Sequence, residues 1–125
     1  MKAYHGTSAT NAKNILEYGF SLDYYRAISL GKGIYLSKDA KKCAEYGECI
    51  LEVEIDERSI LKDDFSSISK YIQQKQHDGS FEFHTKKFRD YTLSKGFKGL
   101  ELNTFNEIVI YDLNCILSVS PYAVT

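Results

Sequence analysis

Three short blocks, spread over the length of the chain, hold the residues whose types could do chemistry. They are Tyr4–Thr7 (Tyr-His-Gly-Thr), Gly31–Tyr35 (Gly-Lys-Gly-Ile-Tyr) with Tyr46 beyond it, and Asn106–Asp112 (Asn-Glu-Ile-Val-Ile-Tyr-Asp). Together they supply one histidine, a pair of tyrosines and one carboxylate, Glu107, at strand or turn boundaries. This inventory suits a site that binds a nucleotide bearing a flat cationic ring and then breaks the bond to that ring.

The two tyrosines are the residues that could hold such a ring. Strand alternation places Tyr35 opposite the core-facing Ile34 and Leu36, and helical spacing projects Tyr46 from the same side as Cys43. We expect the tyrosines to face each other across a slot, where stacking and cation–π attraction contribute about 1 kcal/mol per contact. The alternative is that both rings pack in the core, which is the commoner fate of an aromatic side chain.

The other members of the blocks each have a structural alternative. Gly31-Lys32-Gly33 permits close backbone approach, but it matches neither GxGxxG nor the Walker pattern, so a plain turn is the default. His5 lies between a strand and a capped helix, where a lone histidine is more often structural than catalytic. Glu107 opens a buried run, and is either a solvated strand end or a deliberately placed charge.

The composition is that of one globular domain. The 125 residues are 43% hydrophobic and 26% charged, with a net charge of −1, so no overall field attracts nucleic acid or membrane. Cys43, Cys49 and Cys115 form no CxxC pair, which argues against a disulfide framework and against a metal site. Without a secretory segment or a membrane-spanning run, we expect a cytoplasmic monomer with no metal and no membrane partner.

Hydrophobic periodicity and end signals predict an α+β domain that spans residues 1–125, with strands at both ends and helices between them. The predicted strands cover 2–5, 33–36, 50–56, 99–102, 107–113 and 116–119. The predicted helices run between Ser8 and Gly19, between Ser37 and Gly47, around Ile68, Tyr71 and Ile72, and from Phe88 through Tyr91 and Thr92 to Gly96, with a turn at His77–Ser80 before the last.

The ordered blocks resemble the catalytic domain of the poly(ADP-ribose) polymerase and diphtheria-toxin group of ADP-ribosyltransferases, the His-Tyr-Glu group. The resemblance rests on His5-Gly6-Thr7, Asn11, Ile15, Leu16, Gly19, Gly31–Tyr35, Ala44, Tyr46, Asn106-Glu107 and Tyr111-Asp112, while residues 57–96 match nothing in that group. It implies a fold of split mixed β-sheets with flanking helices around a central NAD cleft. It also implies that NAD is the co-substrate.

The resemblance assigns most of the binding roles to the first two blocks. It implies that His5, assisted by Thr7, hydrogen-bonds the adenosine ribose, and that the Gly6 backbone holds the nicotinamide carboxamide. Tyr35 and Tyr46 should stack on the nicotinamide ring.

The catalytic set that the resemblance implies is Glu107, His5 and Tyr35. Glu107 should bind the 2′-hydroxyl of the nicotinamide ribose and stabilise an oxocarbenium-like transition state. One departure concerns Cys43, which stands where family members have a serine that bonds the carboxamide. A thiol is the weaker donor, so nicotinamide is held less tightly or Gly6 suffices.

The resemblance implies mono-ADP-ribosyl transfer to a macromolecule, protein rather than nucleic acid, by a bacterial or phage effector or toxin. The turn before Glu107 contains Phe105, which lacks the acidic or amide group that arginine- or asparagine-modifying toxins place there. The alternatives are an NAD glycohydrolase, with water as acceptor, and a silent relative that only binds NAD or a protein.

A basic segment lies between His84 and Lys98. It holds Lys86, Lys87, Arg89, Lys95 and Lys98 against a single acid, Asp90. Such a segment is either a phosphate-facing patch or a solvated helix face, and a solvated face is the more common outcome.

Overall fold

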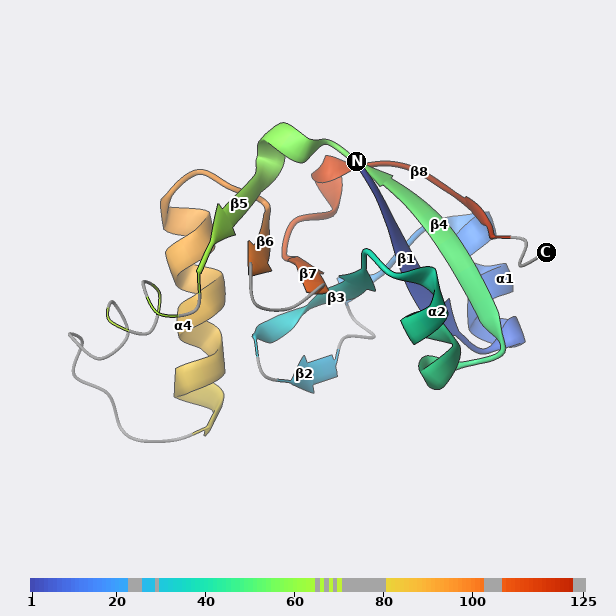
Figure 1. The fold of residues 1–125 in the computed structure, drawn as a ribbon, viewed down its shortest axis with the longest axis horizontal. Helices are drawn as coiled ribbons and strands as arrows, with labels where there is room; N and C mark the ends of the chain where they lie inside the picture. The colour runs from blue at the N-terminus through green and yellow to red at the C-terminus, as the bar shows by residue number, and fades with distance from the viewer. Residues whose placement is uncertain are drawn as a thin grey trace.

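The computed structural model of the chain describes residues 1–22, 26–28, 30–64, 66, 68, 70, 81–102 and 107–122, with side chains of 26–28 and 81–86 excepted. Its helices are α1 (Ala9–Tyr18), α2 (Ala40–Cys43) and α4 (Phe81–Ser94), and its 3-10 turns are η2 (Ala44–Tyr46), η3 (Glu57–Ser59) and η4 (Leu113–Cys115). Helix α4 stands at one end of the molecule, and α1 and α2 lie at the other (Figure 1). No helix in these ranges has the length and apolarity needed to cross a membrane.

The strands form one mixed sheet. They are β1 (Lys2–Thr7), β2 (Arg26–Ile28), β3 (Gly31–Ser37), β4 (Cys49–Ile55), β5 (Ile60–Asp63), β6 (Gly99–Leu102), β7 (Glu107–Ile110) and β8 (Ile116–Pro121). The order across the sheet is β5-β6-β7-β3-β1-β4-β8, with β2 paired to β3 beside this path. Only β5 and β6 run parallel among the described pairs. The expected α+β class is confirmed.

The sheet is narrowest where β1 meets β3. These two strands share the single register pair Tyr4↔Ser37, whereas β1 pairs with β4 from Lys2 to Thr7. The separate sheets implied by the resemblance are therefore halves of one connected sheet, joined at that pair. Beyond Tyr4 the two strands are no longer paired, so side chains rather than backbone bonds connect them there.

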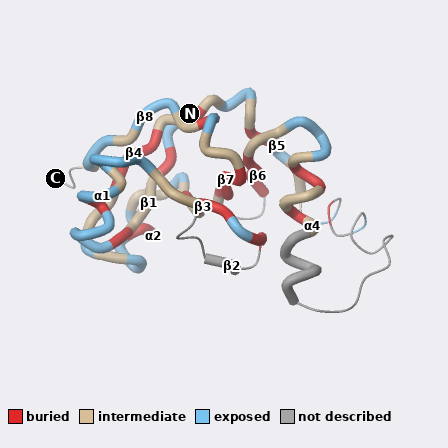
Figure 2. The backbone as a smooth tube through the Cα atoms, turned by 180° about the vertical axis from the view of Figure 1, so that it is seen from behind, coloured by how far each residue is buried: buried red, intermediate tan, exposed pale blue. Residues whose placement is uncertain are grey.

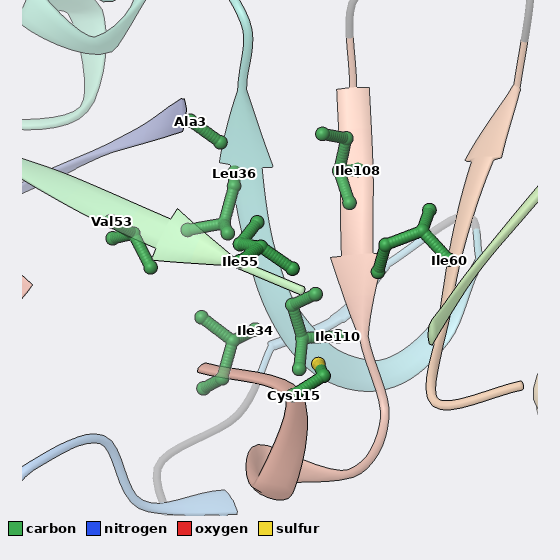
Figure 3. Packing of buried hydrophobic residues seen from close by; sticks show 9 residues of the cluster. All are labelled: Ala3, Ile34, Leu36, Val53, Ile55, Ile60, Ile108, Ile110 and Cys115. Carbon is green, nitrogen blue, oxygen red and sulfur yellow. The ribbon is translucent and has the colours of Figure 1, made fainter. Parts of the chain in front are cut away.

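One hydrophobic core lies on the face of the sheet that carries Ile34, here called the Ile34 face. Its buried members come from strands far apart in sequence and meet around Leu36, Ile55 and Ile110 (Figure 3). The full set is Ala3, Ile34, Leu36, Val53, Ile55, Ile60, Ile108, Ile110 and Cys115. Leu51, Val53 and Ile55 are buried as their alternation predicted, and the strand around them is confirmed.

A second core lies on the opposite face, here called the Tyr35 face, where α4 covers β3 and β6. It consists of Leu30, Ile68, Phe88, Tyr91, Leu100, Leu102, Val109 and Tyr111, with Tyr35 packed against it. Because both faces are covered, β6 and β7 are almost wholly buried, whereas the edge strand β8 is mostly exposed (Figure 2). The predicted division of β3, with Ile34 and Leu36 on one face and Tyr35 on the other, is confirmed.

The ends of α1 follow their sequence signals. The Ser8 hydroxyl accepts a hydrogen bond from the Asn11 amide at 3.2 Å, and the Gly19 amide donates to the Ile15 carbonyl at 2.8 Å. Gly19 has φ of 84°, a conformation that favours glycine at a helix end. Both predicted limits of this helix are confirmed.

The prediction that Ser37 caps the second helix is wrong. Asp39 caps α2, since its carboxylate accepts from the Lys41 amide at 3.0 Å, while the Ser37 hydroxyl accepts from the Asp39 amide. Ser37 is still part of β3, where it pairs with Tyr4 on one side and Glu107 on the other. The helix can begin only after those pairings end.

The remaining differences lie near the short strands. Sequence patterns missed β5, which is brief, carries Lys62 and Asp63, and is held by parallel pairing with β6. The strand predicted over 107–113 ends at Ile110, because the Asp112 carboxylate turns the chain by accepting from the Asn114 amide at 3.0 Å. Most of the helix predicted around Ile68 and the turn at 77–80 lie outside the described residues, although Ile68 itself is buried.

Gly6 permits the close packing of α2 on β1. A β-carbon added at Gly6 would overlap the backbone carbonyl oxygen of Cys43, and one at Gly47 would overlap the carbonyl of Thr7. Two glycines therefore let the α2–η2 segment lie directly against the end of β1. Since the opposing atoms are backbone atoms, a side-chain rotation cannot relieve the overlap.

Substitution Gly6→Ala is expected to lower the free energy of unfolding by about 3 kcal/mol, because α2 must shift as a unit to make room for the methyl group. Urea denaturation followed by circular dichroism measures this loss. Ser120→Ala on the exposed edge strand serves as the control and should change stability by less than about 0.5 kcal/mol. A Gly6→Ala protein as stable as the control would show that this packing is looser than described.

Candidate functional site

Tyr35 and Glu107 lie on the same face of neighbouring strands. The β3–β7 register pairs Tyr35 with Val109 and Ser37 with Glu107. Strand alternation therefore puts Tyr35, Ser37 and Glu107 on the Tyr35 face, with the tyrosine and the carboxylate as diagonal neighbours about 7 Å apart. The Glu107 charge accordingly contributes to raising the pKa of the Tyr35 hydroxyl. Two of the predicted catalytic residues thus come together from distant parts of the chain.

Glu107 carries its charge in a half-buried place. Burial raises the pKa of its carboxyl above the ordinary value of 4.5, because removal from water disfavours the ionised form. No hydrogen bond or ion pair to Glu107 occurs within the part of the chain that the structure describes. The Glu107 carboxylate is therefore half-buried at the start of β7. It is not the fully solvated strand end of the alternative interpretation.

Two tyrosine hydroxyls fasten the turn between β2 and β3. Tyr35 donates to the Gly31 carbonyl at 2.5 Å and accepts from the Leu30 amide at 3.2 Å. Tyr111 donates to the Leu30 carbonyl at 2.6 Å. Burial is the main cause that raises the pKa of Tyr35 to about 12, and the Leu30 amide opposes it. The turn and both rings form one hydrogen-bonded unit behind Glu107.

Gly6, Cys43 and Tyr46 lie toward the same face. Gly6 shares the Tyr35 face with Tyr4 by alternation, and α2 covers Gly6 there. The Cys43 side chain is 2% exposed and its sulfur donates to the Asp39 carbonyl at 3.8 Å. Burial is the main cause that raises the thiol pKa, and the neighbouring Asp39 carboxylate adds to it. The thiol is therefore enclosed behind Gly6 and does not line an open surface.

No ring pair joins Tyr46 to Tyr35 among the described residues. The Tyr46 side chain is 59% exposed on η2. The expected slot is thus open on the Tyr46 side, and its role in stacking stays a prediction. The alternative that both tyrosines pack in the core does not hold for Tyr46.

His5 and Thr7 belong to the opposite face of β1. His5 pairs with Leu51, a buried neighbour of the Ile34 face, and its ring meets Phe20 edge-on with centroids 5.2 Å apart. The Nδ1–H of His5 donates to the backbone carbonyl of Tyr35 at 3.0 Å, which bridges β1 to β3 where their pairing has ended. His5 thus holds the strand that carries Tyr35, and its imidazole does not lie on the Tyr35 face with Glu107. Thr7 is buried.

The described residues contain no group of three His, Cys, Asp or Glu side chains arranged to hold a metal ion. Phe105 and Asn106, predicted to take part in acceptor choice, lie outside the described residues. Tyr111 had no predicted role, although it belongs to the third block. A buried tyrosine next to a strand end was the available signal, because such a hydroxyl needs a partner.

Two hollows occur elsewhere on the surface. One, of about 730 Å³, lies between α1 and the β4–β8 edge, and the other, of about 410 Å³, lies between α4 and η4. Neither is lined by His5, Tyr35 or Glu107. A central cleft that joins these three residues is therefore not shown by the described part of the chain.

Comparison with known protein families finds a similarity that is limited to the first part of the chain. The poly(ADP-ribose) polymerase catalytic domain matches residues 1–55, which include His5, Gly6, Tyr35, Cys43 and Tyr46. The match covers less than half of the 125 residues. A search among curated proteins finds no match.

A solved structure described as an anti-CRISPR protein is similar over almost the whole chain. The TM-score is 0.50 at 11% sequence identity, with 98% of this chain and 95% of that chain covered. At such low identity the similarity shows the fold alone.

Tyr111→Phe is expected to lower the free energy of unfolding by about 1–2 kcal/mol, because the buried Leu30 carbonyl loses its hydrogen-bond donor. Thermal or urea denaturation measures the change. Tyr18→Phe removes the same hydroxyl from a ring that is 78% exposed and should leave stability unaltered. Equal stabilities for the two variants would contradict the fastening role of Tyr111.

Glu107→Gln is expected to raise the unfolding midpoint at pH 7, because the folded state pays for a desolvated charge that glutamine lacks. Since the folded pKa is raised, this penalty is present above the folded pKa and vanishes below the ordinary value of 4.5. Melting curves at pH 7 and pH 4 should show the gain only at pH 7. Glu45→Gln, at an exposed glutamate, should show none at either pH, and an unaltered Glu107→Gln midpoint at pH 7 would contradict the raised pKa.

Proposed function

We propose that the chain is a mono-ADP-ribosyltransferase that moves ADP-ribose from NAD to a macromolecule and releases nicotinamide. The observation that carries the proposal joins sequence similarity to geometry. The segment similar to poly(ADP-ribose) polymerases, residues 1–55, contains Tyr35, and Glu107 reaches the same face of the sheet from outside that segment. A carboxylate beside an aromatic ring is the arrangement that nicotinamide cleavage needs.

The division of labour follows from where charge resides during the reaction. Nicotinamide is cationic in NAD and neutral after it leaves, so an aromatic ring favours the ground state and mainly positions the substrate. Positive charge develops instead on the ribose. A carboxylate fixed beside that carbon attracts the positive charge more strongly in the transition state than in the ground state, which is the condition for catalysis. Glu107 takes this role, since its desolvation leaves the ionised form in need of a cation.

The binding roles are distributed around Gly6 and the tyrosines. The Gly6 backbone holds the carboxamide, Tyr35 provides one wall, and the exposed Tyr46 closes on the ring from the other side. The buried Cys43 packs against Gly6 on the Tyr35 face, and the Gly6 backbone rather than the thiol is the partner of the carboxamide. His5 orders the strand that carries Tyr35 through its hydrogen bond to the Tyr35 carbonyl, and its contact with the adenosine ribose stays a prediction.

Water and a macromolecule are the two acceptors to distinguish. We favour a protein acceptor and an effector or toxin role, which the resemblance implies, over an NAD glycohydrolase or a silent NAD-binding relative. Labelled NAD added to a cell lysate, with Glu107→Gln as the matched control, shows whether label enters protein, RNA, DNA or a small molecule. Stoichiometric free ADP-ribose without any lysate would identify the glycohydrolase, and tight NAD binding without nicotinamide release would identify the silent relative.

Glu107→Gln is expected to reduce turnover about a hundredfold or more while much of the NAD affinity remains, because the lost charge acts only in the transition state. Tyr46→Ala should instead raise KM for NAD with a smaller change in kcat, because its ring acts in the ground state. Steady-state nicotinamide release measures both. An unchanged rate of nicotinamide release by Glu107→Gln would contradict the catalytic role of Glu107. A normal KM for NAD in Tyr46→Ala would contradict the stacking role of Tyr46.

A further inference from the structure

The hollow between α4 and η4 holds an arginine that the proposed NAD site does not use. Arg89 lines it together with Tyr111, Asp112 and Asn114, and leucines complete the walls. The leucines are Leu22, Leu93 and Leu113. Arg89 and Leu93 are four residues apart on α4, so they project from the same side of the helix into this space.

Arg89 forms no hydrogen bond or ion pair among the described residues. Its side chain is nevertheless half-buried. Its charge still affects the buried Tyr111. Burial raises the pKa of the Tyr111 hydroxyl, and the positive charge of Arg89 opposes that increase. A guanidinium withdrawn from solvent without a carboxylate is uncommon, since its desolvation is not compensated within the protein.

Lys95, another member of the basic segment, does not line this hollow. Lys95 is exposed and lies over the Tyr91 ring, with its nitrogen 5.0 Å from the centroid. The side chain of Lys86 lies outside the described residues. Arg89, by contrast, is half-buried and lines the hollow.

Asp112 is the acidic group that faces the same hollow. Its carboxylate accepts from the Asn114 amide at 3.0 Å, so it is fixed in the cap of η4. It forms no ion pair with Arg89, which places the charged atoms more than 4.0 Å apart. The hollow thus presents a cation and an anion separately, with the Asn114 side chain beside them at the surface.

We propose that this hollow binds a nucleoside monophosphate, with the phosphate on Arg89. A guanidinium presents paired N–H donors that match phosphate oxygens, and Arg89 has no ion-pair partner among the described residues. The leucine walls accept the flat apolar faces of a base, and Asp112 accepts from an amino or hydroxyl group. The volume of about 410 Å³ lies in the range of small-ligand sites.

The hollow adjoins the proposed NAD site without being part of it. Tyr111 lines the hollow and donates a hydrogen bond to the Leu30 carbonyl, while the Tyr35 hydroxyl accepts from the Leu30 amide in the same turn. Glu107 begins β7 and Tyr111 follows its last residue, Ile110, so Tyr111 and the hollow lie at the other end of the strand from the carboxylate. The inference does not depend on ADP-ribosyl transfer, since it concerns binding alone.

Titration of the isotope-labelled full chain with AMP, inorganic phosphate and adenosine tests the inference by amide chemical shifts. AMP should shift the amides of Arg89, Leu93 and Asn114, bind more tightly than phosphate, and outcompete adenosine. Arg89→Met should weaken AMP binding about tenfold or more, since a charge-assisted hydrogen bond is lost.

Lys13→Met removes a cation that lines the other hollow and should leave AMP affinity unchanged. Equal losses for Arg89→Met and Lys13→Met, or no shifts around Arg89, would overturn the site. Phosphate that binds as tightly as AMP would overturn the nucleoside part. Amide shifts confined to Gly6 and Tyr35 would also overturn it, because AMP would then be bound at the proposed NAD site. The proposed enzyme activity is tested separately, and it fails if no nicotinamide is released.

Discussion

The register between β3 and β7 is the constraint on which the rest of the site depends. It sets Tyr35 and Glu107 on one face and Leu36 and Ile108 on the other. Because side chains alternate, a shift by one residue would exchange the faces and bury the carboxylate in the Ile34 core. The apolar residues of both cores oppose such a shift. The same burial that stabilises the sheet therefore fixes the chemistry.

A second consequence of the register is that the polar groups of the site are withdrawn from water. Tyr35 and Tyr111 stand beside a carboxylate in a region that α4 covers, and their hydroxyls satisfy the backbone of a turn. Such a network has few ways to rearrange, because each unpaired buried group is costly. Glu107 is the exception, since it carries a charge without a described partner. A ligand cation beside Glu107 would compensate this charge.

Sequence patterns predicted the parts of the fold that local signals determine. Alternation in β4, the cap at Ser8 and the two faces of β3 depend on neighbours in sequence. The parts that were missed depend on distant pairing: β5 exists through β6, and Ser37 stays in β3 because of Tyr4 and Glu107. His5 illustrates the same limit at the site. Its residue type indicated chemistry, but only the pairing with Leu51 reveals that its ring lies on the other face.

A structure of the chain with a non-hydrolysable NAD analogue tests the central claim most directly. The account predicts that the nicotinamide ribose lies against Glu107, with the ring on Tyr35 and Tyr46 moved inward to cover it. Binding in the groove between α1 and β8, or in the hollow beside Arg89 with Glu107 left empty, would contradict the account.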